Sequence, residues 1–126
     1  MTRFKFLFLV ALVVGFVSLV YAGYDEGKTA YDRGDYAKAY KECKTAAEQG
    51  YAVAQFNLGL MYAKGQAVPK DNAEALNWLC KAAEQGYVEA QRLLGVMYYL
   101  GQGVSKDDVE AVKWLRKAAE RGAAQP

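Results

Sequence analysis

Apolar residues recur every three or four positions along most of this chain, and that spacing places them on one face of a helix. The pattern is clearest in two segments, residues 51–64 and 87–100, whose apolar positions correspond one to one. They are Ala54, Leu58, Met61 and Tyr62 in the first segment and Ala90, Leu94, Met97 and Tyr98 in the second. We therefore expect two equivalent amphipathic helices.

A second helix is predicted after each of these segments. Asp71 and Asp107 stand at the N-cap positions, and a Glu follows each of them three residues later, which resembles a capping box. Apolar positions then follow at helical spacing: Ala75, Trp78, Leu79, Ala82 and Ala83, matched by Ala111, Trp114, Leu115, Ala118 and Ala119. Gly86 and Gly122 come at the expected helix ends, where a left-handed glycine is common.

The two helix pairs repeat each other closely. Residues 51–86 and 87–122 align without a gap and are identical at 21 of 36 positions. A period of this length is typical of helical repeat arrays. Gly59 and Gly95 lie inside the first helices, where glycine costs ~1 kcal/mol relative to alanine. We expect them to mark points at which two helices cross closely.

A third, degenerate unit is predicted over residues 23–50. Residues 46–50 match residues 82–86, and the second helix of this unit begins directly after Gly34-Asp35. Its inter-helix loop is five residues shorter than in the other units, because the first helices align at an offset of 31 and the second helices at an offset of 36. The chain is therefore predicted to be all-α, with six helices in three hairpins.

The string Leu-Gly-x-x-Tyr-x-x-Gly, followed by Val, Asp, Ala, Trp, Lys-Ala-Ala and Gly at fixed spacing, occurs in both closely matched units. It resembles the Sel1-like repeat, a relative of the tetratricopeptide repeat with a longer inter-helix loop. The unit over residues 23–50 looks more like a plain tetratricopeptide repeat. The resemblance implies a right-handed α-α superhelix, a short α-solenoid, that binds a protein or peptide. It does not name the partner, because a fold does not determine a function.

The resemblance also implies a concave groove lined by the first helix of each unit. Positions on these helices that differ between the two matched units are candidate partner-binding residues: Phe56, Leu60, Lys64, Arg92, Val96, Tyr99 and Leu100. Their counterparts in the degenerate unit, at the offset of 31, are Asp25, Thr29, Asp32 and Arg33. One end of the groove is therefore expected to be acidic. In the alternative interpretation Phe56, Tyr99 and Leu100 pack against neighbouring helices and the charged residues form a solvated face.

Residues 1–22 are predicted to be a cleavable signal peptide. Arg3 and Lys5 precede an apolar run over residues 6–20, and small residues stand three and one positions before a cut between Ala22 and Gly23. This pattern predicts a periplasmic or secreted protein. The alternative is an uncleaved helix that tethers a regulatory adaptor to a membrane and leaves the groove unchanged.

The balance of charge argues against two classes of partner. The chain carries 16 basic and 14 acidic residues, and removing residues 1–22 takes away Arg3 and Lys5, which leaves 14 against 14. A neutral protein without a basic block offers no electrostatic footprint for nucleic acid or for an anionic membrane surface. A membrane contact is expected only if the leader stays in place.

Cys43 and Cys80 are the only cysteines, and they fall on the second helices of adjacent units. The axes of packed helices lie ~8–10 Å apart, so a disulfide between them depends on the direction of the side chains. Export would favour the bond, and two buried free thiols are the alternative. Some Sel1-like families place a bridging cysteine where this chain has Ala83 and Ala119, so the chain departs from that arrangement.

The sequence argues against an enzyme, a metal site and a bound cofactor. The chain has no histidine, which removes the usual general base near neutral pH and the commonest zinc ligand. Ser105 is the only serine after residue 22, and that part of the chain has no Ser-x-x-Lys pair and no glycine-rich phosphate loop. A hydrolase or a β-lactam-interacting protein is an alternative that rests only on what is claimed for some cysteine-rich relatives.

The last residues, 123–126, are predicted to be a short tail. Residues 122–126 resemble the entry to another first helix, so the apolar face that carries Trp114 and Leu115 is expected to be uncovered. Repeat arrays generally need polar caps at their ends. We therefore expect end-to-end self-association of two copies.

Overall fold

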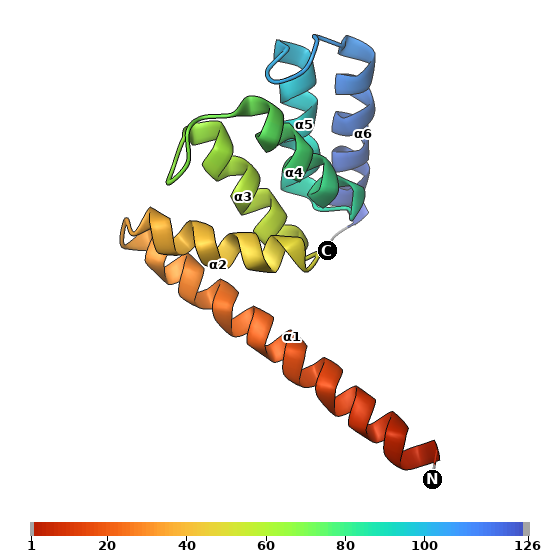
Figure 1. Cartoon of the computed structure of the whole chain (residues 1–126). Helices are drawn as coiled ribbons and strands as arrows, with labels where there is room; N and C mark the ends of the chain where they lie inside the picture. The colour runs from red at the N-terminus through yellow and green to blue at the C-terminus, as the bar shows by residue number, and fades with distance from the viewer. Residues whose placement is uncertain (1, 125–126) are drawn as a thin grey trace.

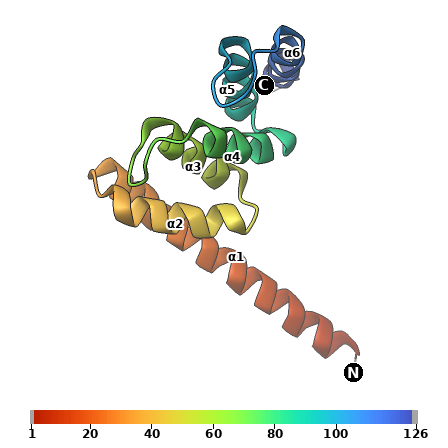
Figure 2. The same ribbon diagram turned by 45° about the horizontal axis from the view of Figure 1, so that its top comes forward.

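The computed structural model describes the backbone of residues 2–124, which forms helices and no strand. The helices are α1 (Thr2–Asp32), α2 (Tyr36–Glu48), α3 (Ala52–Lys64), α4 (Asn72–Glu84), α5 (Val88–Leu100) and α6 (Asp108–Ala124). Successive helices form hairpins that stack one on the next, as Figures 1 and 2 show from two directions. The predicted all-α superhelix of helix hairpins is confirmed.

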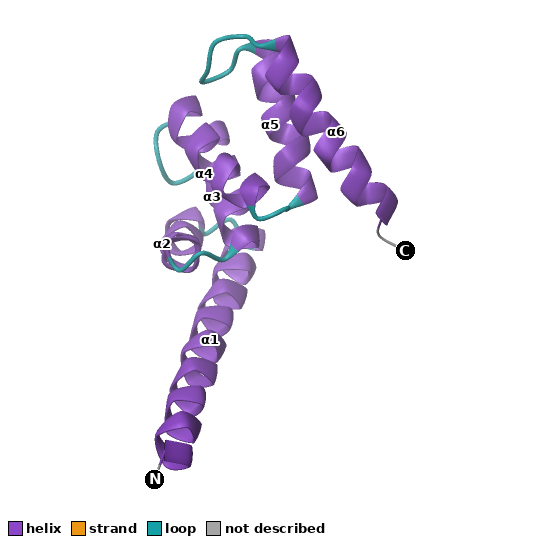
Figure 3. Ribbon diagram, turned by 90° about the vertical axis from the view of Figure 1, so that its right-hand side faces the viewer, coloured by secondary structure: helices purple, strands orange, loops and turns teal. Residues whose placement is uncertain are grey.

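Helix α1 has 31 residues and extends well beyond the stacked hairpins at its N-terminal end (Figure 3). It runs without a break through the predicted cleavage position between Ala22 and Gly23. Around this position α1 meets the body of the protein, where the ring of Tyr21 lies 5.0 Å from the ring of Tyr51. Among the residues that the structure describes, no helix is both long enough and apolar enough to span a membrane.

Glycines inside the first helices are points of close helix crossing, as predicted. A Cβ built on Gly59 would lie 2.9 Å from Leu79 Cγ of α4, and one on Gly95 would lie 2.7 Å from the equivalent leucine of α6. Gly27 has the same position in α1, where a Cβ would lie 2.8 Å from Glu42 Cβ of α2. Each hairpin is therefore closed at a glycine that lets two helices approach.

The predicted N-caps form, but the second half of the capping box is made neither at α4 nor at α6, because the N–H groups of Asp71 and Asp107 donate to backbone carbonyls. The Asp71 carboxylate accepts the backbone N–H groups of Ala73 and Glu74, at 3.0 and 3.1 Å. Asp107 caps α6 in the same way. The backbone N–H of Asp71 donates to the carbonyl of Tyr62 at 2.9 Å instead of to a glutamate side chain. This bond ties the end of the loop to the end of α3, so the N–H group is already used.

The two glycines predicted to end second helices behave differently. Gly86 has φ +91° and follows α4, which confirms its left-handed position. The prediction for Gly122 was wrong, because α6 continues through it to Ala124. After Gly86 the chain continues with Tyr87, whose N–H donates back to Ala82 O at 3.1 Å and closes the helix end. After Gly122 it continues with alanines, which favour helix.

Hydrogen bonds between adjacent hairpins recur from one repeat to the next. The buried side-chain amide of Gln55 donates to the carbonyl of Ala47 at 3.2 Å. Gln91 makes the same bond one repeat later, to the carbonyl of Ala83 at 3.1 Å. Sequence reasoning missed this role, and its only signal was that these glutamines are identical in the two matched units.

Candidate binding surface

Three of the predicted partner-binding residues form an exposed apolar strip on α5. Val96, Tyr99 and Leu100 are 41%, 57% and 55% exposed. Their spacing of three and four residues places them on one side of the helix. The Nζ of Lys106 lies 4.9 Å from the centre of the Tyr99 ring, so a cation–π contact holds the loop beside the strip. We call these three residues the α5 strip.

The other four predicted residues have different surroundings. Phe56 is half-buried, packs against the core, and its ring lies 5.1 Å from the ring of Tyr87. Leu60 is half-buried and lines a cavity, while Lys64 and Arg92 are exposed. Leu60 and the α5 strip therefore lie on the surface formed by the first helix of each hairpin. Phe56, in contrast, mainly packs against neighbouring side chains.

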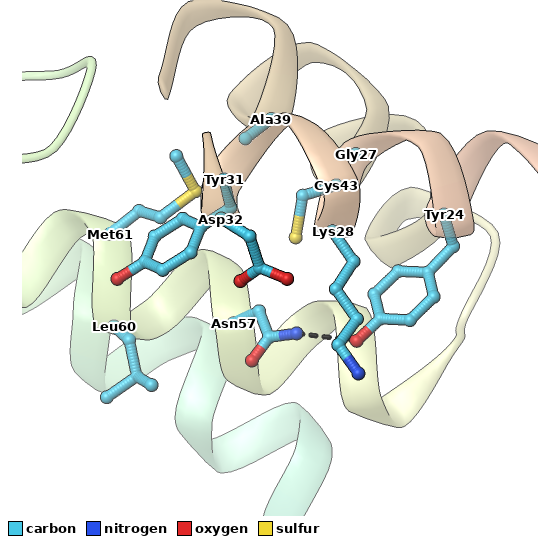
Figure 4. Close-up of a pocket in the computed structure, with 10 residues that line it drawn as sticks. All are labelled: Tyr24, Gly27, Lys28, Tyr31, Asp32, Ala39, Cys43, Asn57, Leu60 and Met61. Carbon is cyan, nitrogen blue, oxygen red and sulfur yellow. Dashed lines mark hydrogen bonds between the residues drawn. The ribbon is translucent and has the colours of Figure 1, made fainter. Parts of the chain in front are cut away.

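A cavity of about 230 Å³ lies between α1 and α3, with α2 behind it. Figure 4 shows the residues around it. They are Tyr24, Gly27, Lys28, Tyr31 and Asp32 from α1, Ala39 and Cys43 from α2, and Asn57, Leu60 and Met61 from α3. All of them follow the predicted cleavage position, so removal of residues 1–22 would leave every lining residue in the chain.

Two tyrosines hold α1 against the second hairpin beside this cavity. The side-chain amide of Asn57 donates to Tyr24 Oη at 2.6 Å, and Tyr31 Oη donates to Gln66 Oε1 at 3.0 Å. Burial raises the pKa of Tyr24 to about 12, with smaller contributions from Cys43 and other neighbouring groups. The Tyr24 phenol is therefore neutral near pH 7 and acts as a hydrogen-bonding group.

The counterparts of the groove residues on α1 differ from those predicted. Gly27 crosses α2 as Gly59 crosses α4, so the first helices align at an offset of 32 and not 31. The matching residues of α1 are accordingly Tyr24, Lys28, Tyr31 and Asp32, all of which line the cavity. Of the predicted set Asp25, Thr29, Asp32 and Arg33, only Asp32 does so. The expected acidic end was wrong, because this shift by one residue brings Lys28 beside Asp32.

The two cysteines are free and lie in different parts of the core. Cys43 is buried beside Ala54, and its thiol donates to the Ala54 carbonyl at 3.0 Å. Burial raises the pKa of Cys43 to about 12, so its thiol stays protonated at neutral pH. Cys80 is half-buried and packs against the cluster around Leu94.

Within the described side chains, no group of three or more histidine, cysteine, aspartate or glutamate residues is placed to hold a metal ion. The two ion pairs found there, Lys106 with Asp108 and Lys113 with Glu110, are solvent-exposed pairs at the start of α6. Exposed pairs of this kind contribute little to stability. The surface thus presents apolar side chains, tyrosines and one amide, together with the exposed charged residues Lys28, Asp32, Lys64 and Arg92.

The stacked hairpins correspond to a known repeat. The model of the Sel1 repeat matches residues 18–51, 52–87 and 88–122. This chain belongs to the Sel1 repeat family. The first Sel1 repeat is matched from residue 18, so it includes the last five residues of the predicted leader.

Solved Sel1 repeat structures are similar to this chain. A protective antigen present in uropathogenic Escherichia coli strains, with an SLR fold, is 44% identical over 82% of this chain, with a TM-score of 0.77. A Sel1 repeat protein from Oxalobacter formigenes is 43% identical over 78%, with a TM-score of 0.74. Helicobacter pylori cysteine rich protein B is 30% identical over 68%, with a TM-score of 0.66.

This chain spans 23%, 40% and 64% of the length of those three proteins. No curated protein matches it. Sel1 repeats typically serve as non-enzymatic scaffolds for interactions between proteins.

Proposed function

We propose that this protein is an exported scaffold that binds a protein or peptide along the layer formed by α1, α3 and α5. Binding rests on a preformed surface and involves no chemical step. The partner lies across the α5 strip and reaches the cavity between α1 and α3. Repeat arrays commonly present such extended surfaces, because each repeat contributes one helix to the same layer.

The α5 strip is the observation that carries this proposal. An exposed tyrosine beside two exposed aliphatic side chains lowers the solubility of a protein. Contiguous apolar patches on soluble proteins commonly mark interaction sites. Tyrosine is also enriched among the residues that dominate binding energy at interfaces. Leu60 on α3 extends the same layer of helices toward the cavity.

The first test uses peptides selected on the purified protein from a displayed random library. Their affinity is then measured by fluorescence anisotropy for variants of the strip. Val96→Asp and Tyr99→Ala are each expected to weaken binding ~10-fold or more, because both side chains are exposed and available for contact.

Asn77→Asp is the matched control for Val96→Asp, since it adds the same charge at an exposed position of α4. It should leave the affinity unchanged, and all three variants should keep the wild-type melting temperature. Wild-type affinity in both strip variants would rule out the α5 strip as the binding surface.

Export is the second part of the proposal, supported by the basic start and apolar run of residues 1–22. The alternative is a tethered adaptor that keeps its leader, and the Sel1 match from residue 18 is compatible with it. The intact mass of the protein produced with its own leader separates the two: a chain beginning at Gly23 supports export, and one beginning at Met1 supports the tether.

Self-association is a second candidate, and the outer face of α6 favours it. The expectation that Trp114 lies uncovered was wrong, because Trp114 is 9% exposed and packs in the core cluster. The large exposed apolar residues of α6 are Val109, Val112 and Leu115, at 81%, 53% and 40%. The position of Val112 on α6 corresponds to Leu76 on α4, which is packed against the core. Light scattering should show a dimer at high concentration that Val112→Asp abolishes. A wild-type monomer throughout the concentration range would exclude this interface.

A further inference from the structure

We propose that the cavity between α1 and α3 is the anchor pocket of the binding surface, and that it takes one large apolar side chain, such as Phe or Leu, from a bound peptide. This inference rests on the proposed function and adds the chemistry of the bound segment. Three properties of the cavity support it: its origin in the sequence, the apolar character of its walls, and the polar groups at its edge.

The cavity exists because two residues differ between equivalent positions of neighbouring repeats. Cys43 stands on α2 where α4 has Leu79, which is fully buried over Gly59. Asn57 stands on α3 where α5 has Leu93, which packs against the core. Smaller and more polar residues therefore leave a space open between α1 and α3. The equivalent region between α3 and α5 contains the two leucines instead.

The walls of the cavity accept an apolar group. Its inner surface is formed by Ala39, Cys43 and Met61, which are all buried, with half-buried Leu60 beside them. Lys28 and Asp32 are exposed and stand at the entrance. The volume of about 230 Å³ exceeds the ~150 Å³ that suffices for a benzene ring in an apolar protein cavity. One large side chain therefore fits with its end against the inner surface.

Polar groups beside the pocket are arranged to hold the main chain of the same segment. The Asn57 amide donates to Tyr24 Oη, and this leaves the Asn57 Oδ1 and the Tyr24 hydroxyl proton free among the described contacts. Together they offer one acceptor and one donor, which matches the N–H and C=O of a peptide unit. Figure 4 shows Asn57, Tyr24 and Lys28 together on one side of the cavity.

The test uses capped amino acids as probes and the full chain as it is produced. Methyl NMR signals of Met61 and Leu60 are followed while N-acetyl-L-phenylalaninamide or N-acetyl-L-leucinamide is added. Both should bind with dissociation constants on the order of 1 mM, as expected for ligands of this size. N-acetylglycinamide should cause no shift. Tighter binding of N-acetyl-L-lysinamide would overturn the apolar specificity and point instead to a basic side chain held by Asp32.

Variants taken from the neighbouring repeat locate the probe. Cys43→Leu fills the inner surface with the residue of the next repeat and should weaken phenylalanine-probe binding ~10-fold or more. Leu60→Trp, at the half-buried residue beside the inner surface, is a second blocking variant if Cys43→Leu is poorly folded. Cys80→Leu makes the same chemical change outside the cavity and should leave the affinity unchanged. Unchanged binding in both blocking variants would exclude the cavity.

The selected peptides then separate this inference from the proposed function. If Val96→Asp abolishes peptide binding and Cys43→Leu does not, the α5 strip is supported as the binding surface and the cavity is excluded as its anchor pocket. If Cys43→Leu abolishes probe binding while substitutions in the α5 strip leave the affinity of every selected peptide unchanged, the cavity is supported as a binding site. The proposal of an extended binding surface across α5 is then excluded. Loss of peptide affinity in both variants supports the two proposals together.

Discussion

Leu94→Ala is expected to lower the free energy of unfolding by about 3–5 kcal/mol, because it leaves a cavity at the centre of the core. Leu94 is 0% exposed and lies in the cluster that joins α4, α5 and α6 through Leu79 and Trp114. Truncation removes buried methyl groups and leaves a cavity in a close-packed interior. Since small domains are stable by only ~5–15 kcal/mol, urea denaturation followed by circular dichroism should show a large shift of the midpoint.

Leu100→Ala is the matched control, because it makes the same substitution at the exposed end of the same helix. Leu100 is 55% exposed, so the free energy of unfolding should change by less than ~0.5 kcal/mol. Equal effects of the two substitutions would contradict the placement of Leu94 in the core.

Gly95→Ala is expected to destabilise the protein by about 1–3 kcal/mol, although alanine is the better helix former. The new Cβ would lie 2.7 Å from Leu115 Cγ and 3.1 Å from the carbonyl oxygen of Ala111. The leucine can shift, but the backbone of α6 cannot move away without opening the hairpin. The same urea titration measures the loss.

Gly122→Ala should have the opposite sign and stabilise the protein by ~0.5–1 kcal/mol. Gly122 lies inside α6, and the nearest atom to a Cβ built there is Arg92 Nη2 at 3.9 Å. Both substitutions add one methyl group to a helical glycine, so the difference in sign isolates the effect of helix crossing. Stabilisation by Gly95→Ala would show that α5 and α6 do not approach as described.

The predicted binding residues show what a repeat pattern predicts and what it leaves open. Helical periodicity determines which side chains share a side of a helix, so it places Val96, Tyr99 and Leu100 together, and they are exposed there. Phe56 belongs to the same set by position, yet it packs beside Tyr87. Comparison of two units shows which positions vary, but not whether a neighbouring side chain covers them.

The cavity could not be predicted from the same pattern. It depends on the register of α1, and the match of Tyr31 with Tyr62 favoured an offset that is wrong by one residue. The deciding contact is Gly27 against α2, between residues that belong to different helices. A shift of one residue turns a helix by about 100° and replaces one set of side chains by another.

By itself, the sequence determined the succession of helix hairpins, the N-caps at Asp71 and Asp107 and the crossing glycines Gly59 and Gly95. These features depend on interactions within a few residues of the chain or on a periodicity that occurs in both matched repeats. Tertiary structure alone decided the register of α1 and the cavity between α1 and α3. Each of these depends on which residues meet across helices, and such contacts are set by packing between segments distant in the chain.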